Sequence, residues 1–177
     1  TGPVCGPSLC LEAGDRFGGE LLSLSTESLK LRTTRGTELE IPLLHVLGIE
    51  FGTSLSQAAK QKIEQQLRNP GAEDTALVLG QDQSITSVSG SVQGLEEGKL
   101  RFAYQGEVRS INQPRLAALV FASHPPARKG LAPYQQFQLA SGDQISGTWT
   151  AIKGDSFKLQ TIWDRTLELP SSTVTNV

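Results

Sequence analysis

Few side chains in this sequence have the types and spacing that catalysis needs. His45 and His124 are its two histidines, and the chain holds no nucleophile elbow, phosphate-cradling glycine loop or HExxH motif. Asp15 and Asp143 could form a carboxylate pair, but each follows a glycine in a turn, where aspartate bonds its own backbone. We therefore expect no catalytic residue. A hydrolase site between distant segments, with a histidine beside a serine and a carboxylate, stays a remote alternative.

Cys5 and Cys10 are the only cysteines. The turn residues Gly6 and Pro7 could bring their α-carbons within about 6 Å, as a disulfide requires, and such a bond would indicate an oxidising compartment. The alternative is two free thiols, one of them packed under the first strand. We expect no metal, because a zinc site takes about four Cys, His or carboxylate ligands, and no cofactor.

The elements that would position these residues are repeated along the chain. Residues 11–49 match residues 139–177 at a constant offset of 128, with 12 identities in 39 positions. A more diverged copy lies between them, at an offset of 71 near Gly90 and of 70 after a hairpin one residue shorter. Similarity at fixed spacing marks a duplicated structural unit. The identities are Leu11/Leu139, Gly14/Gly142, Asp15/Asp143, Gly19/Gly147, Ser28/Ser156, Lys30/Lys158, Leu31/Leu159, Thr33/Thr161, Leu39/Leu167, Glu40/Glu168, Pro42/Pro170 and Val46/Val174.

Each copy has the pattern of short, half-buried strands. In the first copy the second strand changes phase after Gly19, which indicates a bulge or bend. Pro42 ends the fourth strand, because proline cannot donate to the ladder, and a single helical turn over Leu43 to His45 precedes the fifth. This pattern predicts an all-β fold of three tandem small SH3-like or Sm-like five-stranded barrel units with one connector helix. The inward-facing residues expected in the third copy are Ile145, Trp149, Phe157, Leu159, Leu167, Leu169 and Val174.

The expected division of the chain follows from these copies. Residues 1–52 form the first barrel unit, 53–73 the connector helix, 74–122 the second unit, 123–132 a proline-rich linker and 133–177 the third unit. A unit of roughly 45 residues rarely buries enough apolar surface to fold alone. The units should therefore pack against one another or against neighbouring chains.

The connector helix is predicted from an apolar stripe at four-residue spacing, which includes Ile63 and Leu67. Ser54 with Gln57 has the spacing of a capping box. We expect this helix to pack against the first barrel.

Trp163 is the best candidate for a binding contact, at the tip of the hairpin between the third and fourth strands of the last copy, where it aligns with Arg35. An exposed indole would suit a sugar or a protein partner. The alternative is that Trp163 caps a neighbouring copy. The repeated Glu40 and Glu168 are expected on a solvated strand face, where they could pair with lysines of the adjacent strand.

Composition excludes some classes of partner. The net charge is −2 and the pI is about 5.7, which argues against nucleic-acid or anionic-membrane affinity. No apolar run approaches the ~20 residues of a membrane span. The chain starts without a signal peptide and holds no methionine, so we expect a processed segment with further sequence downstream.

The stretch from Leu11 to Phe51, "LEAGDRFGGELLSLSTESLKLRTTRGTELEIPLLHVLGIEF", resembles the short β repeats of secreted planctomycete-type bacterial proteins that precede NPCBM-like, carbohydrate-binding domains. The stretch "GLEEGKLRFAYQGEVRSINQPRLAALVFA" at 94–122 resembles the companion repeat. The resemblance implies a secreted, periplasmic or cell-envelope location and defines no catalytic residue. The carbohydrate-binding domain itself is not in this sequence.

A second resemblance is to the Sm-like RNA-binding barrel, through the "G-x-x-x-x-G-x-L" hairpin. Where the Sm pattern has Asp and Asn, this chain has Ser25 and Ser28, and "IPLLHVLGI" replaces the Arg-Gly motif. The function expected from the sequence is therefore a non-catalytic β-repeat module for protein or glycan contacts, or a structural spacer. An Sm-like nucleic-acid binder is the alternative, and the oligomeric state is left open.

Overall fold

The computed structural model describes residues 6–51, 54–122 and 134–176, and these residues form an all-β arrangement with one α-helix, as the sequence predicted. The strands fall into three consecutive groups. The first strand group comprises β1 (Ser8–Leu11), β2 (Arg16–Leu24), β3 (Ser28–Thr33), β4 (Glu38–Pro42) and β5 (Val46–Glu50). The second strand group comprises β6 (Asp74–Leu79), β7 (Ile85–Glu96), β8 (Lys99–Tyr104), β9 (Glu107–Asn112) and β10 (Leu116–Val120). The third strand group comprises β11 (Gln135–Leu139), β12 (Gln144–Lys153), β13 (Ser156–Thr161), β14 (Thr166–Pro170) and β15 (Val174–Asn176).

The antiparallel pairing order is the same in all three groups. The second strand pairs with the first and third, the third with the fourth, and the fifth returns to the first. A short 3-10 turn precedes each fifth strand: η2 (Leu43–His45), η3 (Gln113–Arg115) and η4 (Ser171–Thr173); a further turn, η1 (Glu12–Gly14), joins β1 to β2. The helical turn expected after Pro42 is therefore present.

The long second strand of each group bends where the sequence changes phase. Its pairing with the third strand slips by one residue after Leu21, Val92 and Trp149 respectively. Just before each slip lies a glycine: Gly19, Gly90 or Gly147. A Cβ there would collide with a backbone carbonyl of the third strand, so only glycine allows the two backbones to approach this closely.

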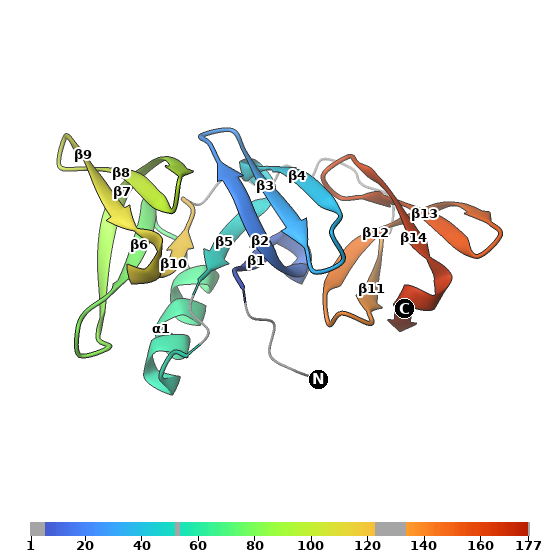
Figure 1. The fold of residues 1–177 in the computed structure, drawn as a ribbon, viewed down its shortest axis with the longest axis horizontal. Helices are drawn as coiled ribbons and strands as arrows, with labels where there is room; N and C mark the ends of the chain where they lie inside the picture. The colour runs from blue at the N-terminus through green and yellow to red at the C-terminus, as the bar shows by residue number, and fades with distance from the viewer. Residues whose placement is uncertain (1–5, 52–53, 123–133, 177) are drawn as a thin grey trace.

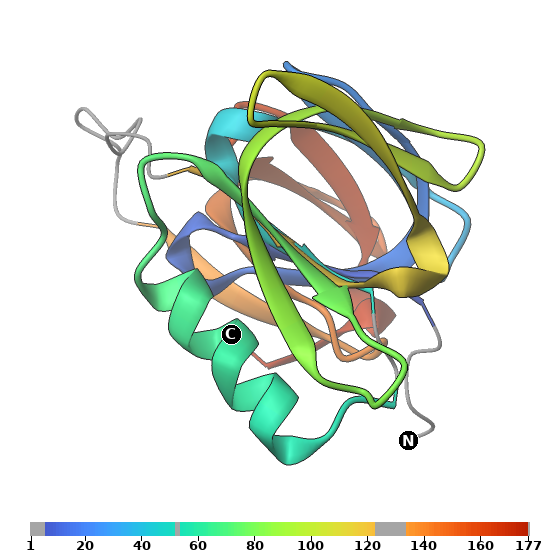
Figure 2. The same ribbon diagram turned by 90° about the vertical axis from the view of Figure 1, so that its left-hand side faces the viewer.

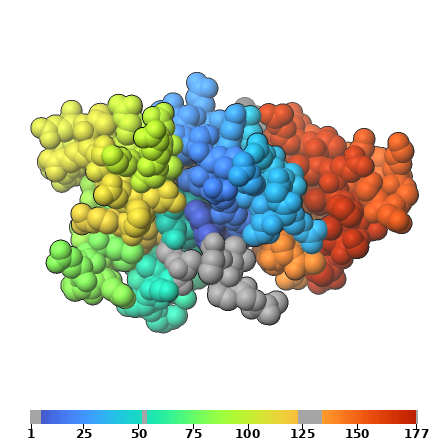
Figure 3. Space-filling view, viewed as in Figure 1, coloured from blue at the N-terminus to red at the C-terminus, as the bar shows by residue number. Residues whose placement is uncertain are grey.

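The three groups do not form separate sheets. Their strands join one fifteen-stranded sheet, and within the described residues no pairing links the fourth strand of a group to its fifth. The first group lies in the middle of an elongated molecule, between the second group and the third (Figure 1), and the space-filling view shows one continuous body (Figure 3).

The first group contacts the second group on one side and the third group on the other, and both contacts have a local twofold character. β5 pairs antiparallel with β10 about Ile49 and Leu119, two residues at the offset of 70. β2 meets β7 at Leu24 and Leu95, at the offset of 71. On the other side of the first group, β2 meets β12 at Arg16 and Gln144, at the offset of 128. Each contact thus joins a surface to the equivalent surface of its neighbour.

The connector helix α1 spans Gln57–Arg68, and Ser56 is its N-cap: the Ser56 hydroxyl accepts a hydrogen bond from the Ala59 amide at 3.2 Å. The capping residue is therefore Ser56, where the sequence pattern predicted Ser54. The buried face of the helix holds Ile63 and Leu67. The helix lies along the sheet where the first and second groups join (Figure 2), against Cys10 of β1 and residues of β6 and β10. The helix therefore packs against the first group, as expected, and against the second group as well.

The main core runs through all three groups. Of the inward residues expected in the third group, Ile145, Phe157 and Leu159 are fully buried, and Leu167, Leu169 and Val174 are partly buried. Trp149 was wrongly expected in the core. Its side chain is 38% exposed, although its ring lies 4.5 Å from that of Phe157.

Candidate functional site

Asp15 and Asp143, the repeated carboxylates, lie in the contact between the first and third groups. Oδ2 of Asp15 accepts a hydrogen bond from the Ser146 amide at 2.8 Å, and Oδ1 accepts one from the Ser146 hydroxyl at 2.5 Å. In return, Oδ1 of Asp143 accepts from the amide of Gly18 at 2.8 Å. Since Ser146 is Gly18 plus 128, the two bonds are equivalent. Both carboxylates are buried.

These carboxylates accept hydrogen bonds that join two groups, so their partners differ from those expected. The expected partner was the backbone of the same turn. Asp143 does have a local bond, from the Ser141 hydroxyl at 2.7 Å, yet the cross-group bonds span more than 120 residues. The local twofold relation explains why the aspartate recurs, since one surface must provide both donor and acceptor.

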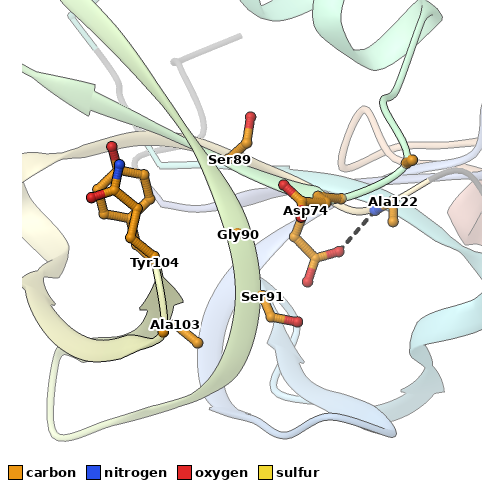
Figure 4. A pocket seen from close by; sticks show the side chains of 11 residues that line it. Asp74, Ser89, Gly90, Ser91, Ala103, Tyr104 and Ala122 are labelled. Atoms are coloured by element: carbon orange, nitrogen blue, oxygen red, sulfur yellow. Dashed lines mark hydrogen bonds between the residues drawn. The ribbon is translucent and has the colours of Figure 1, made fainter.

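A third carboxylate, the partly buried Asp74, anchors the second group. Its Oδ2 accepts from the amide of Val92 at 2.9 Å and its Oδ1 from the amide of Ala122 at 2.8 Å (Figure 4). Asp74 therefore ties the start of β6 to the bend of β7 and to the residues that follow β10. It lies outside the repeat identities, and no sequence pattern pointed to it.

Asp74 is one of the residues that line an open groove of about 740 Å³. Figure 4 shows Asp74 on one side of β7 and the Tyr104 ring on the other. The groove is lined by Ala72, Glu73, Asp74, Ser89, Gly90, Ser91, Ala103, Tyr104, Gln105, Gly106 and Ala122. Carboxylates and hydroxyls of this kind can accept and donate hydrogen bonds to a polar ligand. The lining includes no histidine, cysteine or lysine.

The Tyr104 ring has limited room to stack on a ligand. The guanidinium of Arg109 lies 5.7 Å from the ring centroid, within cation–π range, and the tyrosine is only partly exposed. The groove therefore offers polar contacts more than an aromatic platform.

His45 lies in the first group, away from this groove. Its Nδ1 is 3.7 Å from Oε2 of Glu12, and both atoms are buried without a hydrogen-bond partner. No hydroxyl bonded to His45 is found in the described part of the chain, so the histidine has a carboxylate beside it but no bound serine. His124 lies outside the described residues.

Trp163 is 3% exposed, so it presents almost no face to an external partner. Its ring meets the Phe17 ring of the first group edge-on, with centroids 5.8 Å apart. This is the capping role that the sequence left open. Arg35, its equivalent in the first group, is exposed on the β3–β4 turn, and the structure does not bring the two into one hollow.

Cys10 is a free thiol, while Cys5 lies outside the described residues. The pKa of the Cys10 thiol is raised to about 12, mainly by burial; Arg16 opposes this shift, and Glu50, whose Oε1 is 3.6 Å from Sγ, adds to it. A thiol this protonated is a poor nucleophile.

The repeated glutamates Glu40 and Glu168 are exposed on a strand face, as expected, and each bonds a serine of the adjacent strand. Glu40 lies opposite Lys30 in register, but its carboxylate accepts from the hydroxyl of Ser28 at 3.3 Å. Glu168 likewise accepts from Ser156 at 2.9 Å. Both members of each pair are repeat identities, so these recurring residues form one cross-strand contact twice.

No protein-family model and no curated protein matches this chain. Within the described ranges, no three His, Cys, Asp or Glu side chains are grouped so that they could hold a metal ion. In the same residues, no helix has both the length and the apolar character to cross a membrane.

Proposed function

We propose that this chain is a non-catalytic β-repeat module of a secreted or cell-envelope bacterial protein. In this proposal each strand group is a copy of one SH3-like or Sm-like small barrel, and the module is a structural spacer that also makes protein or glycan contacts. The common pairing order and the bulges at equivalent positions support common descent of the groups.

The observation that carries the proposal is the reciprocal bonding of Asp15 and Asp143. Hydrogen bonds to a charged group contribute about 1.5–3 kcal/mol each, and these lie buried at the junction of two groups. Together with Trp163 against Phe17, they join the groups into one rigid body. The two repeated carboxylates, which could otherwise take part in chemistry, thus bind the neighbouring group.

Two measurements test the spacer. Urea unfolding followed by circular dichroism and by tryptophan fluorescence should give coincident transitions, and small-angle scattering should give an elongated shape that does not change with salt. Separate transitions, or scattering that requires an ensemble of shapes, would show that the three strand groups fold and move independently, which would contradict the proposal.

A binding assay tests the rival class of function. Short fluorescent RNA at low salt should not bind, because the chain carries a net charge of −2 and nucleic-acid affinity depends on concentrated basic charge. Tight, salt-sensitive binding would replace the spacer with an Sm-like RNA binder.

A further inference from the structure

Two strands with an unpaired edge, β4 and β14, line one hollow where the first group meets the third. Within the described residues, β4 pairs only with β3, and β14 pairs only with β13. Figure 1 shows β4 beside the hairpin of β13 and β14. The hollow between them, called here the β4–β14 hollow, measures about 380 Å³ and is lined by Lys30, Glu38, Leu39, Glu40, Trp163, Arg165, Thr166 and Leu167.

The backbone of β4 offers hydrogen-bonding groups along this edge. The Thr33 amide donates to the Thr37 carbonyl at 2.8 Å, so these two residues are a hydrogen-bonded pair of the β3–β4 ladder. Hydrogen-bonded and non-hydrogen-bonded pairs alternate in an antiparallel ladder, so Leu39 bonds to β3, while Glu38 and Glu40 direct their amides and carbonyls away from it. Such an edge is a template on which an extended peptide can add as a further strand.

Charged side chains cross the first group in two rows that end at the same edge. Arg32 lies between Glu20 of β2 and Glu38 of β4, with ion pairs of 3.1 and 2.9 Å. In the next row, Lys30 lies opposite Glu40. Each row therefore ends in a glutamate at the unpaired edge. A basic side chain on an added strand would continue the alternation of charge, because opposite charges attract across neighbouring strands.

The same two glutamates argue against a second copy of this chain as the added strand. In a twofold antiparallel pairing of two β4 edges centred on Leu39, Glu38 of one copy would lie opposite Glu40 of the other. Like charges directly opposite each other destabilise a ladder. The acidic pair is confined to β4, since the equivalent positions of β9 and β14 hold Val108, Ser110, Thr166 and Glu168.

An apolar surface lies between the two charged rows. Leu39 is 6% exposed and Trp163 is 3% exposed, and Leu167 of β14 is partly buried beside them. Successive side chains of a strand point to opposite faces, so the residue between two basic residues of an added strand would face this apolar surface. Lys30 and Arg165 also line the hollow, so a segment with basic residues at every position would be repelled.

We propose that the β4–β14 hollow binds an extended segment of a partner polypeptide in which basic and apolar residues alternate. The segment adds antiparallel to β4, with basic side chains opposite Glu38 and Glu40 and an apolar side chain over Leu39. The start of β14 forms the opposite wall. The inference rests on the proposed function, because it gives the site and the chemistry of one of the protein contacts.

Fluorescence anisotropy with a labelled octapeptide of alternating lysine and valine tests this site. The peptide should bind the wild-type chain saturably, and a peptide with glutamate in place of lysine should not. Glu40→Lys should weaken binding at least about tenfold, because like charges would then lie opposite each other. Glu107→Lys is the matched control, since it changes the net charge equally on β9 of the second group, and it should bind like wild type. Glu40 and Glu107 are both exposed, so both variants should fold.

Methylation of the peptide amides distinguishes strand addition from attraction between charges. In the proposed pairing the lysine amides bond to β4 and the valine amides point away from it. A peptide with N-methylated lysines should therefore bind at least about tenfold more weakly than the unmodified one, and N-methylated valines should have little effect.

Three results would each overturn the site: no saturable binding to wild type, equal weakening by the two protein variants, or equal effects of the two methylated peptides. Binding of the glutamate peptide in place of the lysine peptide would overturn its charge preference and with it the proposed partner. Coincident unfolding transitions of the same sample would leave the spacer function intact in every case.

Discussion

Removing the buried carboxylate of Asp15 should loosen the third group from the first. Asp15→Ala deletes the acceptor of two hydrogen bonds from Ser146, which is itself fully buried. Bonds to a charged acceptor contribute about 1.5–3 kcal/mol each, and a buried donor left unpaired costs about 1–3 kcal/mol. These terms overlap, so we expect a loss of about 3 kcal/mol in the free energy of unfolding. That is a large fraction of the about 5–15 kcal/mol that holds a domain folded.

The assay should report the junction itself. In a Trp149→Phe background, Trp163 is the only tryptophan, and its ring lies against Phe17 across the same contact. Urea unfolding of Asp15→Ala should then show the fluorescence transition ahead of the circular-dichroism transition, because the third group separates first.

Matched variants make this reasoning refutable. Asp155→Ala removes an exposed aspartate of the third group whose side chain has no described hydrogen bond, and it should unfold like the background. Asp143→Ala should cost about 2 kcal/mol, since one of its two bonds is local. An Asp15→Ala variant within about 0.5 kcal/mol of its background, with coincident transitions, would show that the reciprocal bonds do not hold the groups together.

Three further outcomes follow from burial. The pKa of Cys10 rises from 9.0 to about 12 on folding, so the unfolded chain ionises first, and stability falls by about 1.4 kcal/mol per pH unit from pH 9 upward; Cys10→Ala should remove that component from urea titrations. Ile63→Ala should cost about 3 kcal/mol of unfolding free energy, because Ile63 is 1% exposed between α1 and the sheet. Gly48→Ala should cost about 1–3 kcal/mol, since its Cβ would lie 2.5 Å from the Leu119 carbonyl oxygen.

Each of these outcomes has a contrary result. Equal pH dependence of wild type and Cys10→Ala would mean that the thiol is not protected from ionisation. An Ile63→Ala variant as stable as the exposed-face control Gln61→Ala would mean that α1 does not cover the contact between the first and second groups. Wild-type stability in Gly48→Ala would show that β5 and β10 are not held at this close approach.

The order of strands could be predicted from the sequence because it depends on local chemistry. Alternation at Leu29 and Leu31 requires one buried strand face, and Pro42 cannot continue a ladder. The recurrence of Gly19 marks a close backbone approach at the same step of each copy. These properties act within a few residues, so they can be recognised before any contact between distant segments is known.

The candidate sites depended on contacts between distant segments. Asp15 looked like a turn residue because a carboxylate beside glycine has the same local sequence whether it bonds its own turn or Ser146, 131 residues away. Trp149 was wrongly expected in the core, and the two alternatives for Trp163 could not be separated, for a similar reason: burial depends on the neighbour that covers a side chain. The sequence determined what each group buries within itself. Only the tertiary structure decided which groups meet and through which surfaces, because free energy from packing between distant segments leaves no periodic pattern in the chain.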